Sequence, residues 1–164
     1  MTQTKNTPPL SPPILQNIGL IAALWSALES QLEIAILRQQ EIDLPTGMVL
    51  SANLGFQSKL YLLRTFANEG GVEPVSEAKE LLNLIQRIQR AYRDRNLIVH
   101  SVWAATEDPN IARCKGLRVR GKLRIIDEPI SVDRLADIAN MIRQIGADLT
   151  AFMERHNLTP ENSV

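Results

Sequence analysis

Four stretches of this sequence repeat apolar residues at intervals of three or four positions, the spacing of one face of an α-helix. The four stripes are Ile18, Ile21, Trp25, Leu28, Leu32 and Ile36; then Val49, Phe56, Leu60, Leu63 and Ala67; then Leu81, Ile85, Ile88 and Tyr92; and Leu135, Ile138, Ile142, Ile145, Leu149 and Phe152. An amphipathic helix must bury its stripe, and helices joined by short loops do so by packing together. We therefore expect a mainly all-α protein, an up-and-down four-helix bundle.

Capping signals place the ends of the first two helices. Pro12 stands at the first helical position after Ser11, where the missing N–H of proline costs nothing. The segment "LPTG" at 44–47 is expected to end the first helix. A second helix is expected over about 48–68, with Gly55 weakening its middle and a Gly-Gly pair following it.

The third and fourth helices are expected to begin at Ser76 and Ser131, each followed by acidic residues in the first turn. Between these helices, residues of about 101–127 predict a small antiparallel β insertion, with "SVWAAT" as a strand and "EDPN" as a turn. Strict alternation then puts one set of residues on a half-buried face: Leu117, Val119, Leu123 and Ile125. Gly121 marks either a tight turn or the bent middle of one long strand.

The composition indicates a soluble, cytoplasmic protein that does not enter a membrane. Eighteen basic and eighteen acidic residues give no net charge, so any attraction to nucleic acid must come from local clusters. Cys114 is the single cysteine and excludes an internal disulfide, while two histidines and one cysteine make a zinc site unexpected. Residues 14–158 are expected to form one domain, between a flexible Pro-rich tail at 1–13 and a flexible C-terminus at 159–164.

Arg95 interrupts the apolar stripe of the third helix, seven residues after Ile88. Because a guanidinium is costly to bury without a partner, it must find an acid, a water-filled cleft or another molecule. Asn96 and His100 are four residues apart and share a second face of the helix. Arg95 and His100 are separated by about 140° and about 7.5 Å of rise. We expect one helix to have difficulty aiming both at one atom, whereas two copies on a two-fold axis would bring them together.

The segment "RNLIVH" at 95–100, near the end of the third helix of a four-helix bundle, resembles the motif of the HEPN superfamily. That motif is an arginine, often followed by a polar residue, with a histidine after four to six residues. The segments "LWSALESQLE" and "LGFQSKLYLL", and a tryptophan soon after the histidine, are similar to bacterial HEPN-like proteins of unassigned role. The likeness covers residues 14–155 as a helix pattern, and its specific part is six residues long.

The resemblance implies a metal-independent endoribonuclease that acts as a homodimer and uses no cofactor. His100 would carry acid–base chemistry, Arg95 would hold the scissile phosphate, and Asn96 would orient the site or bind a phosphate oxygen. The 2′-hydroxyl of RNA supplies the nucleophile, so the protein need only move protons and stabilise negative charge. Many members are toxins with an antitoxin protein as partner, and others belong to phage-defence systems. The β insertion and the absence of a tyrosine shortly after His100 depart from the toxin members.

A basic run next to the motif is a second candidate site. Residues 111–124 contain six basic residues and no acid. Together with a cation on the third helix, these side chains can contact an RNA backbone through its phosphates: Arg93, Arg118, Arg120, Lys122 and Arg124. The alternative is a solvated strand face whose charges prevent edge-to-edge pairing.

Structural interpretations of the motif residues stay open at this point. Arg95 can be half of an ion pair, with Glu29 as partner. His100 can bond a free carbonyl at the helix end, and Asn96 can make a local bond. The alternative function is accordingly a catalytically silent HEPN-like module for dimerisation or for binding RNA or protein.

Overall fold

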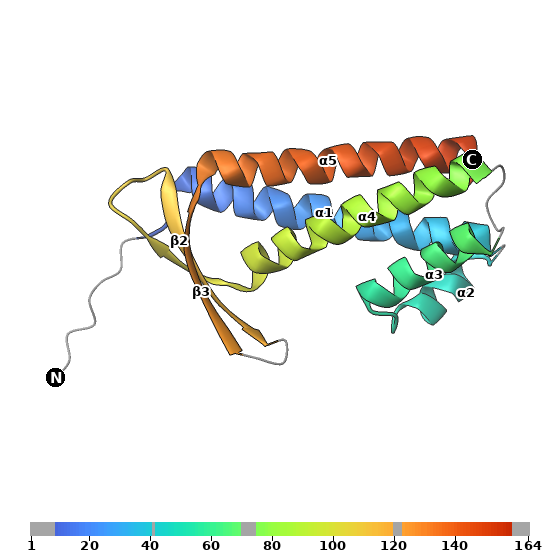
Figure 1. Ribbon diagram of the computed structural model, residues 1–164, viewed down its shortest axis with the longest axis horizontal. Coiled ribbons are helices and arrows are strands. Elements are labelled where there is room, and N and C mark those ends of the chain that lie inside the picture. The colour runs from blue at the N-terminus through green and yellow to red at the C-terminus, as the bar shows by residue number, and fades with distance from the viewer. Residues whose placement is uncertain (1–8, 41, 70–74, 120–122, 159–164) are drawn as a thin grey trace. The chain divides into compact units, whose positions relative to one another are not determined.

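The computed structural model describes residues 9–40, 42–69, 75–119 and 123–158. Within them the chain forms five helices and one small antiparallel sheet (Figure 1). The elements are α1 (Pro12–Gln39), α2 (Leu44–Ser51), α3 (Phe56–Asn68), α4 (Val75–His100), β1 (Val102–Ala105), β2 (Ile111–Val119), β3 (Leu123–Ser131) and α5 (Val132–Arg155). The mainly helical class and the small antiparallel insertion before the last helix are therefore confirmed, and the insertion has three strands.

Contacts along the chain divide it into two compact units. The first comprises residues 1–23 and 91–141, and holds the sheet, the end of α4 and the beginnings of α1 and α5. The second comprises residues 24–90 and 142–164, and holds α2, α3 and the remaining parts of the three long helices. The predicted tails at 1–13 and 159–164 lie outside the described residues, except for residues 9–13.

The sheet of the first unit has the strand order β1-β2-β3 and is antiparallel throughout (Figure 1). Val119 pairs with Leu123, so the chain reverses between β2 and β3. This answers the question that the sequence left open around Gly121, which itself lies outside the described residues. The sheet extends from Val102 to Ser131, a little beyond the insertion predicted at 101–127.

One face of this sheet is buried and the other is exposed. Ala112, Cys114 and Ile130 lie on the buried face. Ile125 is 78% exposed, so the prediction that it lies on a buried face is wrong. The reason is the two-residue period of a strand, because Ile125 is an odd number of residues from Ile130 and points to the opposite face. The side chains of Leu117, Val119 and Leu123 lie outside the described part of the chain.

The segment "LPTG" begins a helix in the second unit instead of ending one. Asp43 is the N-cap of α2, and its Oδ1 accepts a hydrogen bond from the Thr46 backbone N–H at 3.0 Å. The hydrogen bond from the Thr46 backbone is the main reason that the pKa of Asp43 lies below its usual value. Pro45 stands in the first turn, where its fixed φ suits a helix. Asp43, with a proline two residues later, was therefore the signal in the sequence for the start of a helix.

The predicted helix over 48–68 is two helices in the structure. The first, α2, ends at Ser51, and Gly55 is the N-cap of α3 with an extended backbone. A polar side chain at the end of α2 and another near the start of α3 both contact the same side chain of α1. Ser51 Oγ donates to a carboxylate oxygen of Glu33, and Lys59 Nζ lies 3.2 Å from the other oxygen. Glu33 thus fixes the position of both helices within this unit.

The predicted apolar stripes account for most of the core of the second unit and for a smaller part of the core of the first. The buried stripe residues are Ile21, Leu135 and Ile138 in the first unit, and Trp25, Leu28, Leu32, Ile36, Phe56, Leu60, Leu63, Ala67, Leu81, Ile85, Ile88, Ile142, Ile145, Leu149 and Phe152 in the second. Trp25 packs against Phe56 with ring centroids 4.9 Å apart. Val49 is an exception, because α2 leaves it 73% exposed.

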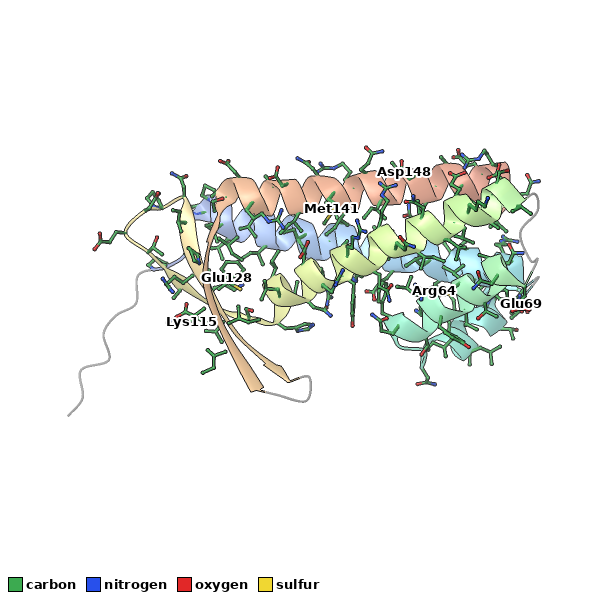
Figure 2. All side chains as sticks on the ribbon, viewed as in Figure 1. Arg64, Glu69, Lys115, Glu128, Met141 and Asp148 are labelled. Carbon is green, nitrogen blue, oxygen red and sulfur yellow. The ribbon has the colours of Figure 1, made fainter. Side chains whose placement is uncertain are left out.

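Charged groups of the second unit also join its helices. Arg87 Nη1 of α4 lies 2.6 Å from Asp148 Oδ2 of α5, and Arg64 Nη2 of α3 donates to Gln89 Oε1 of α4 at 3.1 Å (Figure 2). Burial works to raise the pKa of Asp148, but hydrogen bonds from Gln144 and Arg87 outweigh it and hold that pKa low. These contacts add directional links to an aliphatic core.

By length and composition alone, α1 passes the test for a membrane-crossing helix, as core helices of soluble proteins also do. Of the residues in its most apolar stretch, 39% are buried inside the protein. The predicted localisation in the cytoplasm stays a prediction.

Candidate functional site

The three predicted catalytic residues lie together in the last two turns of α4, within the first unit. Arg95 Nη1 donates to Asn96 Oδ1 at 3.0 Å, and the same nitrogen lies 3.2 Å from His100 Nε2. Arg95 and Asn96 are half-buried, and His100 is exposed. The triad, as we call Arg95, Asn96 and His100, therefore gathers one permanent cation, one amide and one imidazole at the solvent-accessible end of a helix.

The expectation that one helix would have difficulty bringing Arg95 and His100 to one point is wrong. Side chains of a helix lean toward its N-terminus, so the His100 ring lies back over the turn that carries Arg95. The long side chain of Arg95 covers the remaining separation around the helix. The contact forms within a single chain and needs no symmetry mate.

The contact between Arg95 and His100 favours one tautomer of the imidazole. A guanidinium has only donors, so as a hydrogen bond this contact has His100 Nε2 as its acceptor. That arrangement places the ring proton on Nδ1. An anion that replaces His100 as the partner of Nη1 would leave the lone pair of Nε2 available for a proton.

Two further charges lie near the triad along α4. Arg93 is exposed, and Asp94 lies 3.9 Å from Arg134 Nη2 in the first turn of α5. Ser131 caps that turn, because its Oγ accepts a hydrogen bond from the Arg134 backbone N–H at 3.1 Å. The predicted start of the last helix is thereby confirmed. Glu29, the alternative partner of Arg95, belongs to the second unit, and that pairing stays a prediction.

The sheet holds the end of α4 through contacts that the sequence did not reveal. Trp103 Nε1 donates to the Ile98 carbonyl at 2.9 Å, and Cys114 Sγ donates to the Leu97 carbonyl at 3.8 Å. In the sequence, Trp103 was marked only as a tryptophan soon after the motif histidine, and Cys114 only as the single cysteine. The signal available in the sequence was a tryptophan shortly after the expected end of the helix, because its indole N–H can bond a carbonyl of the last helical turn.

The predicted RNA-binding cations are placed in part. Arg93 is exposed on α4, and Arg118 on β2 is the register partner of Arg124 on β3. The side chains of Arg118 and Arg124, and the whole of Arg120 and Lys122, lie outside the described residues. Their contact with RNA stays a prediction.

Two other cations of the basic run pair with an acid on β3. Arg113 Nε lies 2.8 Å from Asp127 Oδ1, and Nζ of Lys115, which is labelled in Figure 2, lies 3.9 Å from Asp127 Oδ2. The hydrogen bond from Arg113 holds the pKa of Asp127 below its usual value, and the charges of Arg113 and Lys115 add to this effect. These two cations are therefore partly neutralised within the sheet.

Across the described ranges, no three His, Cys, Asp or Glu side chains gather closely enough to hold a metal ion. Comparisons with protein-family models, with curated proteins and with solved structures found no match for this chain. The candidate site therefore depends on its own geometry and on the motif "RNLIVH".

Proposed function

We propose that this protein is a metal-independent endoribonuclease of the HEPN type and that the triad is its active site. The observation that carries the proposal is the convergence of Asn96 Oδ1 and His100 Nε2 on one guanidinium nitrogen of Arg95, at 3.0 and 3.2 Å. The arrangement supplies a proton acceptor beside a permanent cation. Cleavage of RNA through its own 2′-hydroxyl requires those two functions.

In the proposed reaction, a phosphate of RNA takes the place of His100 as the partner of Arg95 Nη1. The guanidinium fork suits two phosphate oxygens and stays charged at every physiological pH. His100 Nε2 then accepts the proton of the 2′-hydroxyl as that oxygen attacks phosphorus. The 2′-oxygen–phosphorus bond forms and the phosphorus–5′-oxygen bond breaks. Water donates a proton to the leaving 5′-oxygen, and His100 then releases the proton it accepted to solvent. The products are a 2′,3′-cyclic phosphate and a 5′-hydroxyl.

Asn96 has a supporting role in this proposal. Its Oδ1 accepts from Arg95 Nη1, which limits the positions that the flexible guanidinium can take. Its amide NH₂ can donate to a phosphate oxygen. Asn96 would thus orient the cation and contribute a donor without adding charge.

The proposal includes the partners that the motif implies. The protein would act in the cytoplasm as a homodimer, with RNA as substrate and, in a toxin–antitoxin or phage-defence setting, with an antitoxin protein as partner. A two-fold contact near the end of α4 would place two copies of the triad beside one RNA strand. Sedimentation analysis of the purified protein at several concentrations tests the dimer, and a purely monomeric protein contradicts this part.

One experiment tests the proposed activity with a matched control in the same chain. The protein, His100→Ala and His156→Ala are each incubated with a mixed-sequence RNA in excess EDTA. His156 is the other histidine of the chain, lies in the second unit, and has Nε2 3.3 Å from Glu77 Oε2. We expect the cleavage rate to fall by roughly 10²- to 10⁴-fold in His100→Ala, the usual range for a lost acid–base group, and to be retained in His156→Ala. Equal rates in both variants would contradict the proposal.

A second candidate function is a catalytically silent module that binds a protein. The exposed apolar side chains of α2 and α3 favour it, because Val49 is 73% and Tyr61 70% exposed, with Met48 and Leu50 also exposed. Exposed apolar groups that gather in one region of a surface often mark contact sites. RNA that remains intact in EDTA and in Mg²⁺, together with self-association lost in Val49→Asp, would favour this function.

A further inference from the structure

We infer that Trp103 is a positioning residue for His100, and that the sheet serves as a cap for the catalytic end of α4. This inference rests on the proposed function, because it assigns a role in the same reaction. It explains why a helical protein carries a sheet directly after the motif. Trp103 itself touches none of the proposed reacting atoms.

The last turn of a helix is its least secure part. The last four carbonyl groups have no N–H partner within the helix, so this turn frays unless other donors bond them. In α4 these are the carbonyls of residues 97–100, and residue 100 is the proposed acid–base residue. A frayed last turn would carry the imidazole away from Arg95.

Trp103 supplies one of the required donors. Its indole N–H bonds the Ile98 carbonyl at 2.9 Å, and its side chain is half-buried on β1. Trp103 lies opposite Cys114 in the register, and Cys114 Sγ donates to the Leu97 carbonyl at 3.8 Å. Two neighbouring carbonyls of the last turn thus bond two paired residues of adjacent strands, so the sheet and the turn are tied at two points.

The residue after His100 is fitted to the sheet as well. A Cβ at Gly116 would lie 2.9 Å from Ser101 Oγ, closer than such atoms approach in proteins, and 3.9 Å from Ser101 Cβ. Glycine at this place in β2 lets the strand approach the chain immediately after the motif. Gly116 therefore leaves room for Ser101, and Ser101 is joined directly to His100.

These contacts predict how the loss of one donor affects the reaction. Without the indole N–H, the last turn opens more often, and Arg95 and His100 are in contact for a smaller fraction of the time. In the proposed function most of the affinity for RNA comes from phosphate contacts of the basic residues, so we expect RNA binding to change little. The effect should therefore fall on kcat and spare KM.

The deciding variant is Trp103→Phe, which keeps an aromatic ring and removes the N–H. We expect kcat for RNA cleavage to fall at least tenfold with KM within twofold of its original value. Trp25→Phe removes the same atoms from the other tryptophan, which packs against Phe56 in the second unit, and should keep kcat. An unchanged kcat in Trp103→Phe, or an equal loss in both variants, would overturn the inference.

A second pair of variants keeps the test decisive if Trp103→Phe does not fold. Cys114→Ala removes the donor to the Leu97 carbonyl and should lower kcat with KM retained, whereas Cys114→Ser keeps a donor at that position and should retain more of kcat. A full kcat in Cys114→Ala, or an equal loss in both variants, counts against the inference.

Amide hydrogen exchange separates a failure of this inference from a failure of the proposed function. In Trp103→Phe the amides of residues 97–100 should exchange faster, while those of α3 keep their rates. If exchange changes in this way but the original protein never cleaves RNA, the proposed function is wrong and the capping role of Trp103 stands. If the protein cleaves RNA and exchange in Trp103→Phe is unchanged, this inference alone is wrong.

Discussion

Arg95 Nη1 and His100 Nε2 lie 3.2 Å apart on one helix, although five residues separate them along the chain. Because a guanidinium cannot accept a hydrogen bond, this contact as a hydrogen bond has the lone pair of His100 Nε2 as its acceptor. Replacement of this contact by a substrate phosphate would free a proton acceptor next to a bound anion. In the proposed function, the pair would therefore link substrate binding to the availability of the base.

The first prediction concerns the tautomer of His100. ¹⁵N NMR of the imidazoles should find the His100 proton on Nδ1 and a bare Nε2 that accepts a hydrogen bond. In Arg95→Met the donor is lost, and the Nε2–H form should become populated. The His156 signal, from the second unit, serves as the internal control and should not change. A His100 ring protonated on Nε2 in the unsubstituted protein would contradict this prediction.

Asn96→Asp should strongly reduce the rate of cleavage while leaving the fold intact. A carboxylate at the position of Asn96 Oδ1, 3.0 Å from Arg95 Nη1, would form an ion pair and compete with phosphate for the guanidinium. We expect kcat/KM to fall by about 10²-fold or more, as for a lost transition-state donor. Asn140→Asp adds the same charge at an exposed position of α5 in the same unit and should keep most activity. Activity equal to that of Asn140→Asp would contradict the assigned role.

The predicted RNA-binding cations can be tested by the salt dependence of binding. The residues are Arg93, Arg118, Arg120, Lys122 and Arg124. In a His100→Ala background, which prevents cleavage, each lost phosphate contact should reduce the slope of log K against log salt by about 0.7 for a single strand. Arg155→Ala removes a cation of the second unit that pairs with Glu80 at 2.6 Å, and should leave the slope unchanged. Equal slopes in all variants would contradict RNA binding by these five residues.

Acid should weaken the sheet through Asp127. The hydrogen bond from Arg113 lowers the pKa of Asp127 in the folded state, so the folded protein binds fewer protons than the unfolded chain. This contribution is fully present above the unfolded pKa of about 3.9 and is lost as pH falls through the folded pKa. Denaturant unfolding between roughly pH 3 and pH 7 should therefore give a flatter profile for Asp127→Asn and for Arg113→Ala than for the original protein. Three superimposable profiles would contradict this prediction.

Much of the helical fold was predictable, because each long helix needs one wide apolar face and the sequence shows it directly. The stripe from Leu135 to Phe152 is buried along its whole length, and Ser131 caps its helix as expected. The division at 52–55 was not predictable from the stripe, because Val49 matches the period of α3 but lies on another helix and is exposed. Periodicity alone cannot distinguish a continuous helix from two helices in phase.

The candidate site was predictable in its residues but not in its geometry. The angle of about 140° around an ideal helix describes where the Cβ atoms of Arg95 and His100 lie. Arg95 makes its contact with the far end of a long side chain, which can cover that separation. The capping of α4 depends on strand register, which brings Trp103 and Cys114 side by side, and pairing between strands is a long-range property. The alternation of apolar and basic residues likewise gave a wrong prediction for Ile125. Alternation separates the two faces of a strand but does not show which face is buried.

The most direct test of the account is a double-mutant cycle on RNA cleavage in EDTA, with Arg95→Ala, His100→Ala and the double variant. Residues that act as one unit have strongly non-additive effects. We predict that each single variant loses roughly 10²- to 10⁴-fold in rate and that the double variant loses little more than the worse single one. Single variants that cleave at the original rate, or losses that multiply in the double variant, would contradict the claim that Arg95 and His100 form one catalytic pair.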